Sequence, residues 1–296
     1  MRLDRRQASL GLAASVLLPA ARAEPVFSKP IPATGERIPA IGMGSWLTFD
    51  VGSDRTAIAQ RGRVLATFFA AGGTLVDSSP MYGSSQATIG AALQALKPSR
   101  LFAADKVWIR GAAEGRAQIA ESARRWRRSF DLLQIHNLVD WRTQMATLRA
   151  MKEAGQVRYI GVTSYDGIAY DEVASIMRAE PIDFVQVSYN IADRSAERRV
   201  LPLAAERGIA VIANRPFQEG RLIDAALRRP LPAIAVEAGA RNWPEYLLKF
   251  IVSHPAVTAA IPATRRVDHM RENMAALRGT MPTAATRARM AAAFDG

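Results

Sequence analysis

Residues 131–163 carry the pattern that decides the fold class: DLLQIHNLVDWRTQMATLRAMKEAGQVRYIGVT. Two short β-rich runs, Leu132–His136 and Tyr159–Thr163, enclose the segment 141–154, whose apolar residues recur with a helical period. Gly155 follows this segment and suits the left-handed conformation that often ends a helix. A strand, a helix and a second strand in this order predict a βαβ unit with parallel strands.

The same unit recurs along the chain. Strands are predicted at Ile41–Ser45, Thr74–Asp77, Leu101–Lys106, Leu132–His136, Tyr159–Thr163, Phe184–Val187, Ala210–Ala213 and Thr258–Ile261. Helices are predicted at 55–71, 85–95, 115–129, 141–154, 169–178, 196–207, 241–253 and 267–277. These eight strand–helix pairs predict an α/β fold whose parallel sheet closes into a (β/α)8 TIM barrel. No GxGxxG motif opens the chain, which argues against a Rossmann domain.

Two segments lie outside this repeat. Val26–Ile31 is predicted to be a short hairpin strand that closes the bottom of the barrel. The irregular stretch 216–240 follows the seventh strand and is a candidate substrate lid, because loops of this length are often functional. We expect residues 24–296 to form a single barrel domain.

The composition excludes several classes of protein. Of the 296 residues, 49% are apolar and 22% are charged, so the chain is not disordered and has enough apolar residues for a large core. It contains no cysteine, which excludes disulfides, thiolate metal sites, iron–sulfur clusters and cysteine nucleophiles. Neither an HExxH motif nor a cluster of carboxylates suggests a metal site.

The chain is strongly basic, with a net charge of +12, 34 arginines and five lysines. A basic protein can bind nucleic acid. Here the arginines are scattered through helical stretches with acidic residues between them, and no aromatic-interleaved basic patch is present. A compositional preference for arginine explains the charge better, so we expect no nucleic-acid partner.

Residues 1–23 are predicted to be a twin-arginine (Tat) signal peptide. The pair Arg5-Arg6 precedes the mildly apolar run 10–21, and the small-x-small sequence at 21–23 places cleavage before Glu24. The run has about a dozen residues against the roughly 20 that span a bilayer, so we expect no stable membrane insertion. The prediction is export to the periplasm by the Tat machinery. The alternative is a leader without an export role on a cytoplasmic protein.

Four polar residues lie at the carboxyl ends of three successive strands, where barrels of this class place their chemistry. Asp77 ends the second strand and Tyr82 follows it, Lys106 ends the third, and His136 ends the fourth. A lysine after an apolar run needs a partner, and Asp77 is the natural one. Alternatively, Asp77 and Lys106 form an ion pair that only stabilises the barrel, and His136 is a core residue.

Six segments around these positions resemble the aldo-keto reductases, in family order and at family spacing. They are Gly73-Thr-Leu-Val-Asp-Ser-Ser-Pro-Met-Tyr-Gly-Ser-Ser, Phe102-Ala-Ala-Asp-Lys, Asp131-Leu-Leu-Gln-Ile-His-Asn, Gly155-Gln-Val-Arg-Tyr-Ile-Gly-Val-Thr, Val185-Gln-Val-Ser-Tyr-Asn, and Ile261-Pro-Ala-Thr followed by Arg-Glu-Asn. The resemblance implies a (β/α)8 barrel and NADPH-dependent reduction of a carbonyl. It also implies that Asp77, Tyr82, Lys106 and His136 are the catalytic quartet.

The chemistry of these residues agrees with that role. Hydride addition to a carbonyl needs a proton donor, and a tyrosine has an ordinary pKa of about 10, too high for easy transfer near neutral pH. The ammonium of Lys106, held by Asp77, lowers the pKa of a phenol at Tyr82. His136 can donate a hydrogen bond to the carbonyl oxygen.

The resemblance also implies a set of residues that bind the cofactor: Thr163, Ser164 and Gln186 at the carboxamide, Asn214 beside the nicotinamide, Thr264, Arg265 and Arg266 at the 2′-phosphate, and Asn273 at the adenine. Arg215, next to Asn214, is a further candidate for the pyrophosphate because of its charge. The chain departs from the family at four positions. Ser164 replaces an asparagine, Asn214 an aromatic residue, Ala263 a lysine and Gln86 a glutamate. For Arg265 and Arg266, a plain surface role at the entry to a helix is the alternative.

Trp46 and Trp108 follow the first and third strands, and they either wall an apolar substrate pocket or pack the loops. The predicted function is reduction of an aldehyde or ketone to an alcohol by NADPH, with Tyr82 as proton donor. The alternative is a regulatory or weakly active protein that binds the cofactor on the same barrel, which the Ser164 and Asn214 departures favour.

Overall fold

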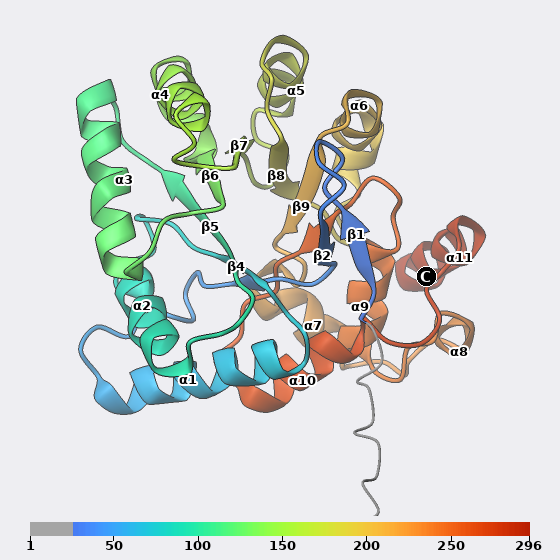
Figure 1. The fold of residues 1–296 in the computed structure, drawn as a ribbon. Helices are drawn as coiled ribbons and strands as arrows, with labels where there is room; N and C mark the ends of the chain where they lie inside the picture. The colour runs from blue at the N-terminus through green and yellow to red at the C-terminus, as the bar shows by residue number, and fades with distance from the viewer. Residues whose placement is uncertain (1–25) are drawn as a thin grey trace, which may run out of the picture.

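Eight parallel strands form a barrel in the computed structural model, which describes residues 26–296 (Figure 1). They are β3 (Met43–Gly44), β4 (Leu75–Asp77), β5 (Phe102–Val107), β6 (Leu132–Ile135), β7 (Tyr159–Thr163), β8 (Phe184–Ser188), β9 (Ala210–Asn214) and β10 (Ala259–Ala260). Each strand pairs with the next in chain order. Parallel bridges from Ile41 to Ala260 and from Gly44 to Ala263 join the two edges, so the barrel is nearly closed. The predicted α/β fold and TIM barrel are confirmed.

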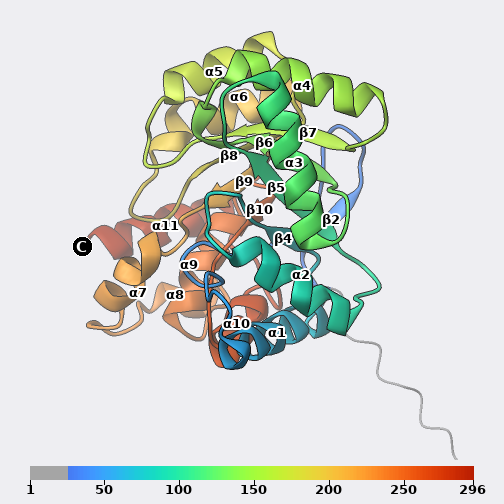
Figure 2. The same ribbon diagram turned by 90° about the vertical axis from the view of Figure 1, so that its left-hand side faces the viewer.

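Helices surround the barrel on its outside (Figures 1 and 2). The eight that follow the strands are α1 (Arg55–Ala70), α2 (Ser85–Leu96), α3 (Ala112–Trp126), α4 (Trp141–Glu153), α5 (Tyr170–Ala179), α6 (Val200–Arg207), α9 (Trp243–Val252) and α10 (Val267–Ala275). Gly155 follows α4 with a φ of +68°, as predicted for a glycine that ends a helix, and Gly208 follows α6 in the same way with a φ of +66°. No helix of residues 26–296 is long and apolar enough to cross a membrane.

Three predicted segments differ in detail from the structure. α3 starts earlier than predicted and stops at Trp126, because Arg127 adopts a left-handed conformation (φ +58°). The predicted helix 196–207 is divided into the 3-10 turn η2 (Ser195–Arg198) and α6. The stretch 216–240 is not irregular throughout, since it contains η3 (Gln218–Gly220), α7 (Arg221–Ala226) and α8 (Ile234–Glu237).

The last helix, α11 (Ala284–Asp295), was not predicted. Its alanine-rich sequence has little amphipathic periodicity, so the main signal of a surface helix is weak. A helix cap starts it, because the Thr283 side chain accepts a hydrogen bond from the Thr286 backbone N–H at 3.1 Å. Tertiary contacts also hold it, since the Tyr246 hydroxyl in α9 donates to the Met290 carbonyl at 2.9 Å.

A hairpin of β1 (Ser28–Pro30) and β2 (Arg37–Pro39) closes the end of the barrel at which the strands begin. Ile31 and Ile38 are both buried and pack against residues at the starts of the strands. These are Leu75, Phe102, Leu132, Tyr159, Phe184 and Ala210. The apolar plug fills the bottom of the barrel and leaves the carboxyl ends of the strands for polar residues. The predicted signal peptide 1–23 and its cleavage site lie outside the described residues.

Candidate active site

A buried ion pair lies at the carboxyl end of the barrel. Lys106 Nζ donates to Asp77 Oδ2 at 2.5 Å and to the Ser78 carbonyl at 2.7 Å, and both charged side chains are almost fully buried. The side-chain amides of Gln134 and Gln186 donate to Asp77 Oδ1 at 3.3 and 3.1 Å. Every oxygen of the Asp77 carboxylate therefore has a donor, as a buried charge requires.

These contacts keep Lys106 charged. Burial alone disfavours the ammonium, but the charge of Asp77 and its hydrogen bond to Lys106 oppose burial, and the pKa of Lys106 is raised above its ordinary value. The site thus holds a fixed positive charge near neutral pH, and the Lys106–Asp77 contact expected from the sequence is present.

Tyr82 lies against this charge. Lys106 Nζ is 5.2 Å from the centroid of the Tyr82 ring, and the ring meets that of His136 edge-on at 5.6 Å between centroids. Burial raises the pKa of the Tyr82 phenol, and Lys106 acts in the opposite direction but does not outweigh it. Lys106 thus lowers the pKa of the phenol as expected, but burial has the larger effect. The phenol stays protonated at neutral pH, which is the state of a proton donor.

His136 is held as a neutral imidazole. Burial and then the charge of Lys106 lower its pKa well below the ordinary value. Its Nδ1 lies 2.7 Å from the Ser79 hydroxyl, and that hydroxyl oxygen also accepts the Met81 backbone N–H at 3.2 Å. Because Ser79 is fully buried, its own proton needs an acceptor, and Nδ1 is the one within reach. This arrangement places the ring proton on Nε2 and makes that atom a donor.

A cavity of about 900 Å³ opens above these groups. Asp77, Tyr82 and His136 form part of its floor, and the segment predicted as a lid lines it from Pro216 to Leu231. A volume of this size accommodates a cofactor or a drug-sized ligand. Three of the four quartet residues thus line one end of one cavity, and the fourth, Lys106, is buried behind them in contact with Asp77. This arrangement argues against unrelated structural roles.

The two tryptophans differ in position. Trp46 lines the cavity and its ring is 6.3 Å from that of Tyr82. The Trp108 ring is 6.4 Å from His136 and 41% of the residue is exposed, but it does not line the cavity itself. Its backbone is tied to α3, because the Trp108 N–H donates to Gln118 Oε1 at 2.6 Å. Trp46 fits the pocket role, and Trp108 lies at its margin.

Most of the predicted cofactor residues line this cavity. They are Thr163, Gln186, Asn214, Arg215, Thr264, Arg265, Arg266 and Asn273. Ser164 does not, because its hydroxyl donates to the Ile168 carbonyl within its own loop. The structure therefore gives the serine that replaces the family asparagine a local role.

Asn214 and Arg215 are engaged by the protein. The Asn214 amide donates to the Ser164 carbonyl at 2.9 Å and its oxygen accepts the Ser188 hydroxyl at 2.8 Å. Arg215 lies 2.9 Å from Asp166 and 2.9 Å from Glu219. Asn214 thus joins the loops after β7 and β9 through polar contacts, and Arg215 has its charge neutralised by two carboxylates.

The two arginines predicted to bind the 2′-phosphate, Arg265 and Arg266, lie in the loop before α10 and differ in their contacts. Arg266 pairs with Asp268, its Nε donating to Oδ1 at 3.0 Å, and its backbone N–H donates to Thr264 Oγ1 at 3.1 Å. Arg265 is exposed and has no hydrogen bond or ion pair with residues 26–296. It is the arginine of this loop that remains available to an anion.

Strained backbone also gathers at this end. Nine of the eleven non-glycine residues with positive φ lie in loops that follow strands: Leu47, Asn137, Leu138, Asp140, Asp166, Ala169, Arg215, Gln218 and Glu219. Such conformations are uncommon and often occur at functional sites. Within the described part of the chain, no group of three or more His, Asp or Glu side chains could hold a metal ion.

Sequence reasoning missed three residues near the site. Ser79 lies two positions after Asp77 and carried a signal, since a hydroxyl in that turn can reach a neighbouring side chain. Asp105 precedes Lys106 but points to the other face of β5, where Gln86 Nε2 donates to it at 2.9 Å. Arg61, in the middle of α1, carried no signal, because the residues of α10 and its preceding loop that lie beside it are about 200 residues away in sequence.

The site combines the protonated phenol of Tyr82, the neutral imidazole of His136 and the buried ammonium of Lys106 at one end of a (β/α)8 barrel. These are groups that can donate a proton and hydrogen bonds to a carbonyl oxygen during its reduction. The family model described as Aldo/keto reductase family matches residues 40–287. The chain therefore belongs to the aldo/keto reductase family and is an NAD(P)H-dependent oxidoreductase.

Two relatives from Escherichia coli K12 are methylglyoxal reductases by name. Methylglyoxal reductase YeaE is 28% identical over 250 residues, which cover 81% of this chain and 86% of that protein. The NADH-specific methylglyoxal reductase is 25% identical over 190 residues, 53% of this chain and 56% of that protein.

Solved structures share the fold. An aldo-keto reductase from Klebsiella pneumoniae in complex with NADPH superposes with a TM-score of 0.76 at 24% identity, covering 91% of this chain and 95% of that one. The thermostable aldo-keto reductase Tm1743, in complex with the inhibitor epalrestat, has a TM-score of 0.74 at 27% identity and covers 90% and 98%.

Proposed function

We propose that this protein reduces an aldehyde or ketone to the alcohol with NADPH, and that Tyr82 donates the proton. The observation that carries the proposal is the contact of a buried Lys106–Asp77 pair with a protonated Tyr82 at the floor of a large cavity. A small dicarbonyl such as methylglyoxal is the first substrate to test, because two relatives are named for it.

The cavity fits a nicotinamide cofactor. Its walls include Thr163, Gln186 and Asn273, which offer hydroxyl and amide groups, and Arg265, which offers a positive charge. When bound, the cofactor would supply the hydride that adds to the carbonyl carbon. Gln186 uses its amide N–H on Asp77, so its oxygen remains for a donor in the cavity.

The residues of the chain would handle the proton. As negative charge develops on the carbonyl oxygen, Nε2 of His136 donates a hydrogen bond to it and fixes its direction. The Tyr82 phenol transfers its proton to the same oxygen, which completes the alcohol. Lys106 stabilises the phenolate that is left, and Asp77 holds Lys106 in place.

The replacement Tyr82→Phe tests this assignment. It should lower kcat for the best carbonyl substrate by about 10²–10⁴-fold, because the general acid is lost. The dissociation constant for NADPH, measured by fluorescence, should change little. Tyr159→Phe is a matched control, since the Tyr159 hydroxyl bonds to Glu36 at the opposite end of the barrel. Near-normal kcat in Tyr82→Phe would remove the quartet assignment.

A second candidate is a regulatory protein that binds the cofactor with little turnover. Ser164 and Asn214 support it, because both use their side chains inside the loops. Measuring the dissociation constant for NADPH together with kcat for carbonyl substrates distinguishes the two functions. Tight cofactor binding by the wild-type protein, without reduction of any carbonyl in a broad panel, would favour the regulatory role.

Export to the periplasm by the Tat machinery remains part of the proposal, and it rests on the sequence of residues 1–23. The change Arg5→Lys with Arg6→Lys should leave the precursor in the cytoplasm, whereas Arg2→Lys should not. N-terminal sequencing of periplasmic protein should start at Glu24, and the protein should carry bound dinucleotide, because the cofactor is made in the cytoplasm. Export that ignores the double change would contradict the Tat assignment, and a Met1 start in cytoplasmic protein would contradict export.

A further inference from the structure

The loop that follows β3 is bonded to the turn that carries Tyr82. Asp50 in this loop is exposed, and its Oδ1 accepts two hydrogen bonds from Ser84, one from the backbone N–H at 2.9 Å and one from the hydroxyl at 2.8 Å. The Ser84 hydroxyl oxygen in turn accepts the backbone N–H groups of Val51 and Gly52 at 2.9 and 2.8 Å. These four hydrogen bonds join the two loops at a position two residues after Tyr82.

The backbone next to Tyr82 also packs against the Asp50 carboxylate. Gly83 has a φ of +56°, and a Cβ atom at this position would lie 2.4 Å from the carboxylate carbon of Asp50. Only glycine leaves room for so close an approach, so the carboxylate and the turn are in direct contact. The Ser85 N–H donates to the Tyr82 carbonyl at 3.0 Å, which makes the turn short. A shift of Ser84 would therefore move the backbone of Tyr82.

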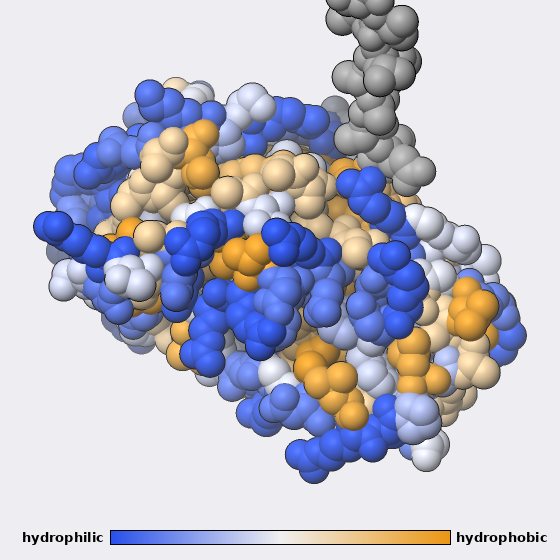
Figure 3. Space-filling view, turned by 90° about the horizontal axis from the view of Figure 1, so that it is seen from below, coloured by the Kyte–Doolittle hydropathy of each residue, from blue (hydrophilic) through white to orange (hydrophobic). Residues whose placement is uncertain are grey.

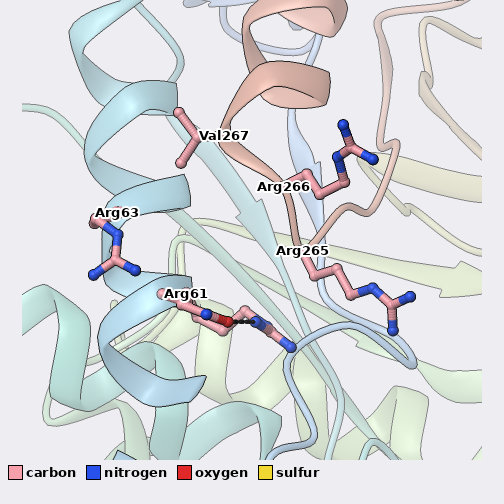
Figure 4. Close-up of a pocket in the computed structure, with 6 residues that line it drawn as sticks. Arg61, Arg63, Arg265, Arg266 and Val267 are labelled. Carbon is pink, nitrogen blue, oxygen red and sulfur yellow. Dashed lines mark hydrogen bonds between the residues drawn. The ribbon is translucent and has the colours of Figure 1, made fainter. Parts of the chain in front are cut away.

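Asp50 is held in place although it is exposed. The residue before it, Phe49, is fully buried in the core. α1 lies along the lower edge of Figure 1, and the middle of the surface seen from that side is largely hydrophilic (Figure 3). From this helix Arg61, which lines a hollow between α1 and the loop before α10 (Figure 4), donates its Nε to the Thr48 carbonyl at 2.5 Å. The Asp50 carboxylate thus reaches Ser84 from a loop that is fixed on both sides.

The charge of Asp50 suits this contact. Ser84 directly precedes α2, so the carboxylate lies at the N-terminus of that helix, where the helix dipole favours a negative charge. The two hydrogen bonds from Ser84 lower the pKa of Asp50 below its ordinary value of 3.8, so the group is ionised at neutral pH. An ionised acceptor forms stronger hydrogen bonds than a neutral one.

We propose that Asp50 is a positioning residue for the proton donor: its contact with Ser84 fixes the turn that holds Tyr82 at the floor of the cavity. Asp50 does not line the cavity, so its effect on the reaction passes through Tyr82. The placement of a reacting group matters, since a shift of about 1 Å can lower a rate about a hundredfold. This inference rests on the proposed function, because it takes Tyr82 as the group that donates the proton.

The kinetic test uses the full-length protein with NADPH. Asp50→Ala removes the acceptor and should lower kcat for the best carbonyl substrate by roughly tenfold, with little change in the dissociation constant for NADPH. Asp50→Asn keeps an oxygen for Ser84 and should retain most of kcat. Asp54→Ala is the matched control, because Asp54 lies in the same loop and accepts two backbone N–H groups at the start of α1. Its loss should lower the melting temperature and leave kcat unchanged.

A second comparison asks whether the effect passes through Tyr82. In the Tyr82→Phe background, Asp50→Ala should lower the remaining kcat by less than about twofold, because the group that Asp50 positions is already lost. A purely structural role would lower kcat by the same factor in both backgrounds.

Histidine NMR gives a readout that needs neither cofactor nor turnover. The chain has three histidines, and the ring of one, His136, meets the Tyr82 ring edge-on at 5.6 Å between centroids. Asp50→Ala should shift the ring-proton signals of His136, because the phenol ring moves, and should leave the signals of the other two in place. Asp50→Asn and Asp54→Ala should leave all three close to their wild-type positions.

Either of two results would overturn the inference. One is a wild-type kcat in Asp50→Ala when Tyr82→Phe has lost its activity. The other is an equal loss of kcat on adding Asp50→Ala to the wild type and to Tyr82→Phe. Failure of the proposed function gives a different result, since Tyr82→Phe would then keep near-normal kcat. In that case the His136 signals of Asp50→Ala would still show whether Asp50 positions the turn.

Discussion

Asp105 should make the stability of this protein depend on pH. It is fully buried on the outer face of β5, where its carboxylate accepts the Lys106 backbone N–H at 2.7 Å and Gln86 Nε2 at 2.9 Å. Burial raises its pKa from the ordinary 3.8 to about 7, although the two hydrogen bonds and the charge of Lys106 oppose the shift. The folded protein therefore holds a proton that the unfolded chain releases.

The size of the effect follows from this shift. A raised folded-state pKa gives stability that is complete below about pH 4 and is lost as the pH rises toward 7. A shift of about three units corresponds to about 4 kcal/mol, because each unit is worth about 1.4 kcal/mol. Asp105→Asn, which carries no charge at any pH, should thus be more stable than the wild type at pH 8 by up to about 4 kcal/mol.

The hydrogen bonding can adapt to this change. Asparagine keeps one oxygen for the Lys106 N–H. Its new N–H group can be accepted by Gln86 Oε1, which has no partner now, if the Gln86 amide rotates. Ser122 Oγ, which accepts from Gln86 at present, can donate after that rotation.

Urea denaturation at pH 5 and pH 8 measures the difference. The gain of Asp105→Asn over the wild type should be much larger at pH 8 than at pH 5. Asp224→Asn, an exposed aspartate on α7, is the control and should change little at either pH. An equal effect of Asp105→Asn at the two pH values, or destabilisation at both, would refute a raised pKa at this position.

Two further changes probe the loops of the site. Ser79→Ala should remove the hydrogen bond at Nδ1 of His136 and lower kcat by about tenfold, with little change in the affinity for NADPH. ¹⁵N NMR should then show a mixture of the two His136 tautomers in place of the Nε2-protonated form alone. An unchanged tautomer would contradict this prediction. Asn214→Tyr should lower the melting temperature and weaken cofactor binding, because both hydrogen bonds of the amide are lost. Tighter binding would show instead that a stacked ring outweighs them.

The fold could be read from the sequence because the barrel repeats one unit. Each strand is a short run of buried residues and each helix is long enough to show its period, so the boundaries were right within a few residues. α11 was missed because its alanine-rich face is nearly uniform, and what places it is contact with α9. Such contacts join segments about 40 residues apart and leave no local pattern.

That Asp77, Tyr82, Lys106 and His136 lie close together could be predicted, because strand ends have fixed places in a barrel. The roles of Ser164 and Asn214 could not, because they depend on how two loops fold. Asp166 and Arg215 adopt left-handed backbone conformations, which a sequence usually signals by a glycine, and neither position is a glycine. The burial of Arg61 could not be predicted for another reason, because an arginine within a helical pattern indicates a solvent-exposed face. Only the approach of α10 turns that position into part of a hollow.

Neighbouring residues on β5 show why burial alone does not decide what a charged group does. Lys106 and Asp105 follow the same apolar run and point to opposite faces of the strand. On the inner face Lys106 meets the carboxylate of Asp77, so the ammonium stays charged and can act on Tyr82. On the outer face Asp105 meets the neutral amide of Gln86, so the carboxyl group holds its proton up to about pH 7. Gln86 stands where the family has a glutamate. A glutamate at this position would place a second buried negative charge beside Asp105, whereas the neutral amide of Gln86 donates a hydrogen bond to it.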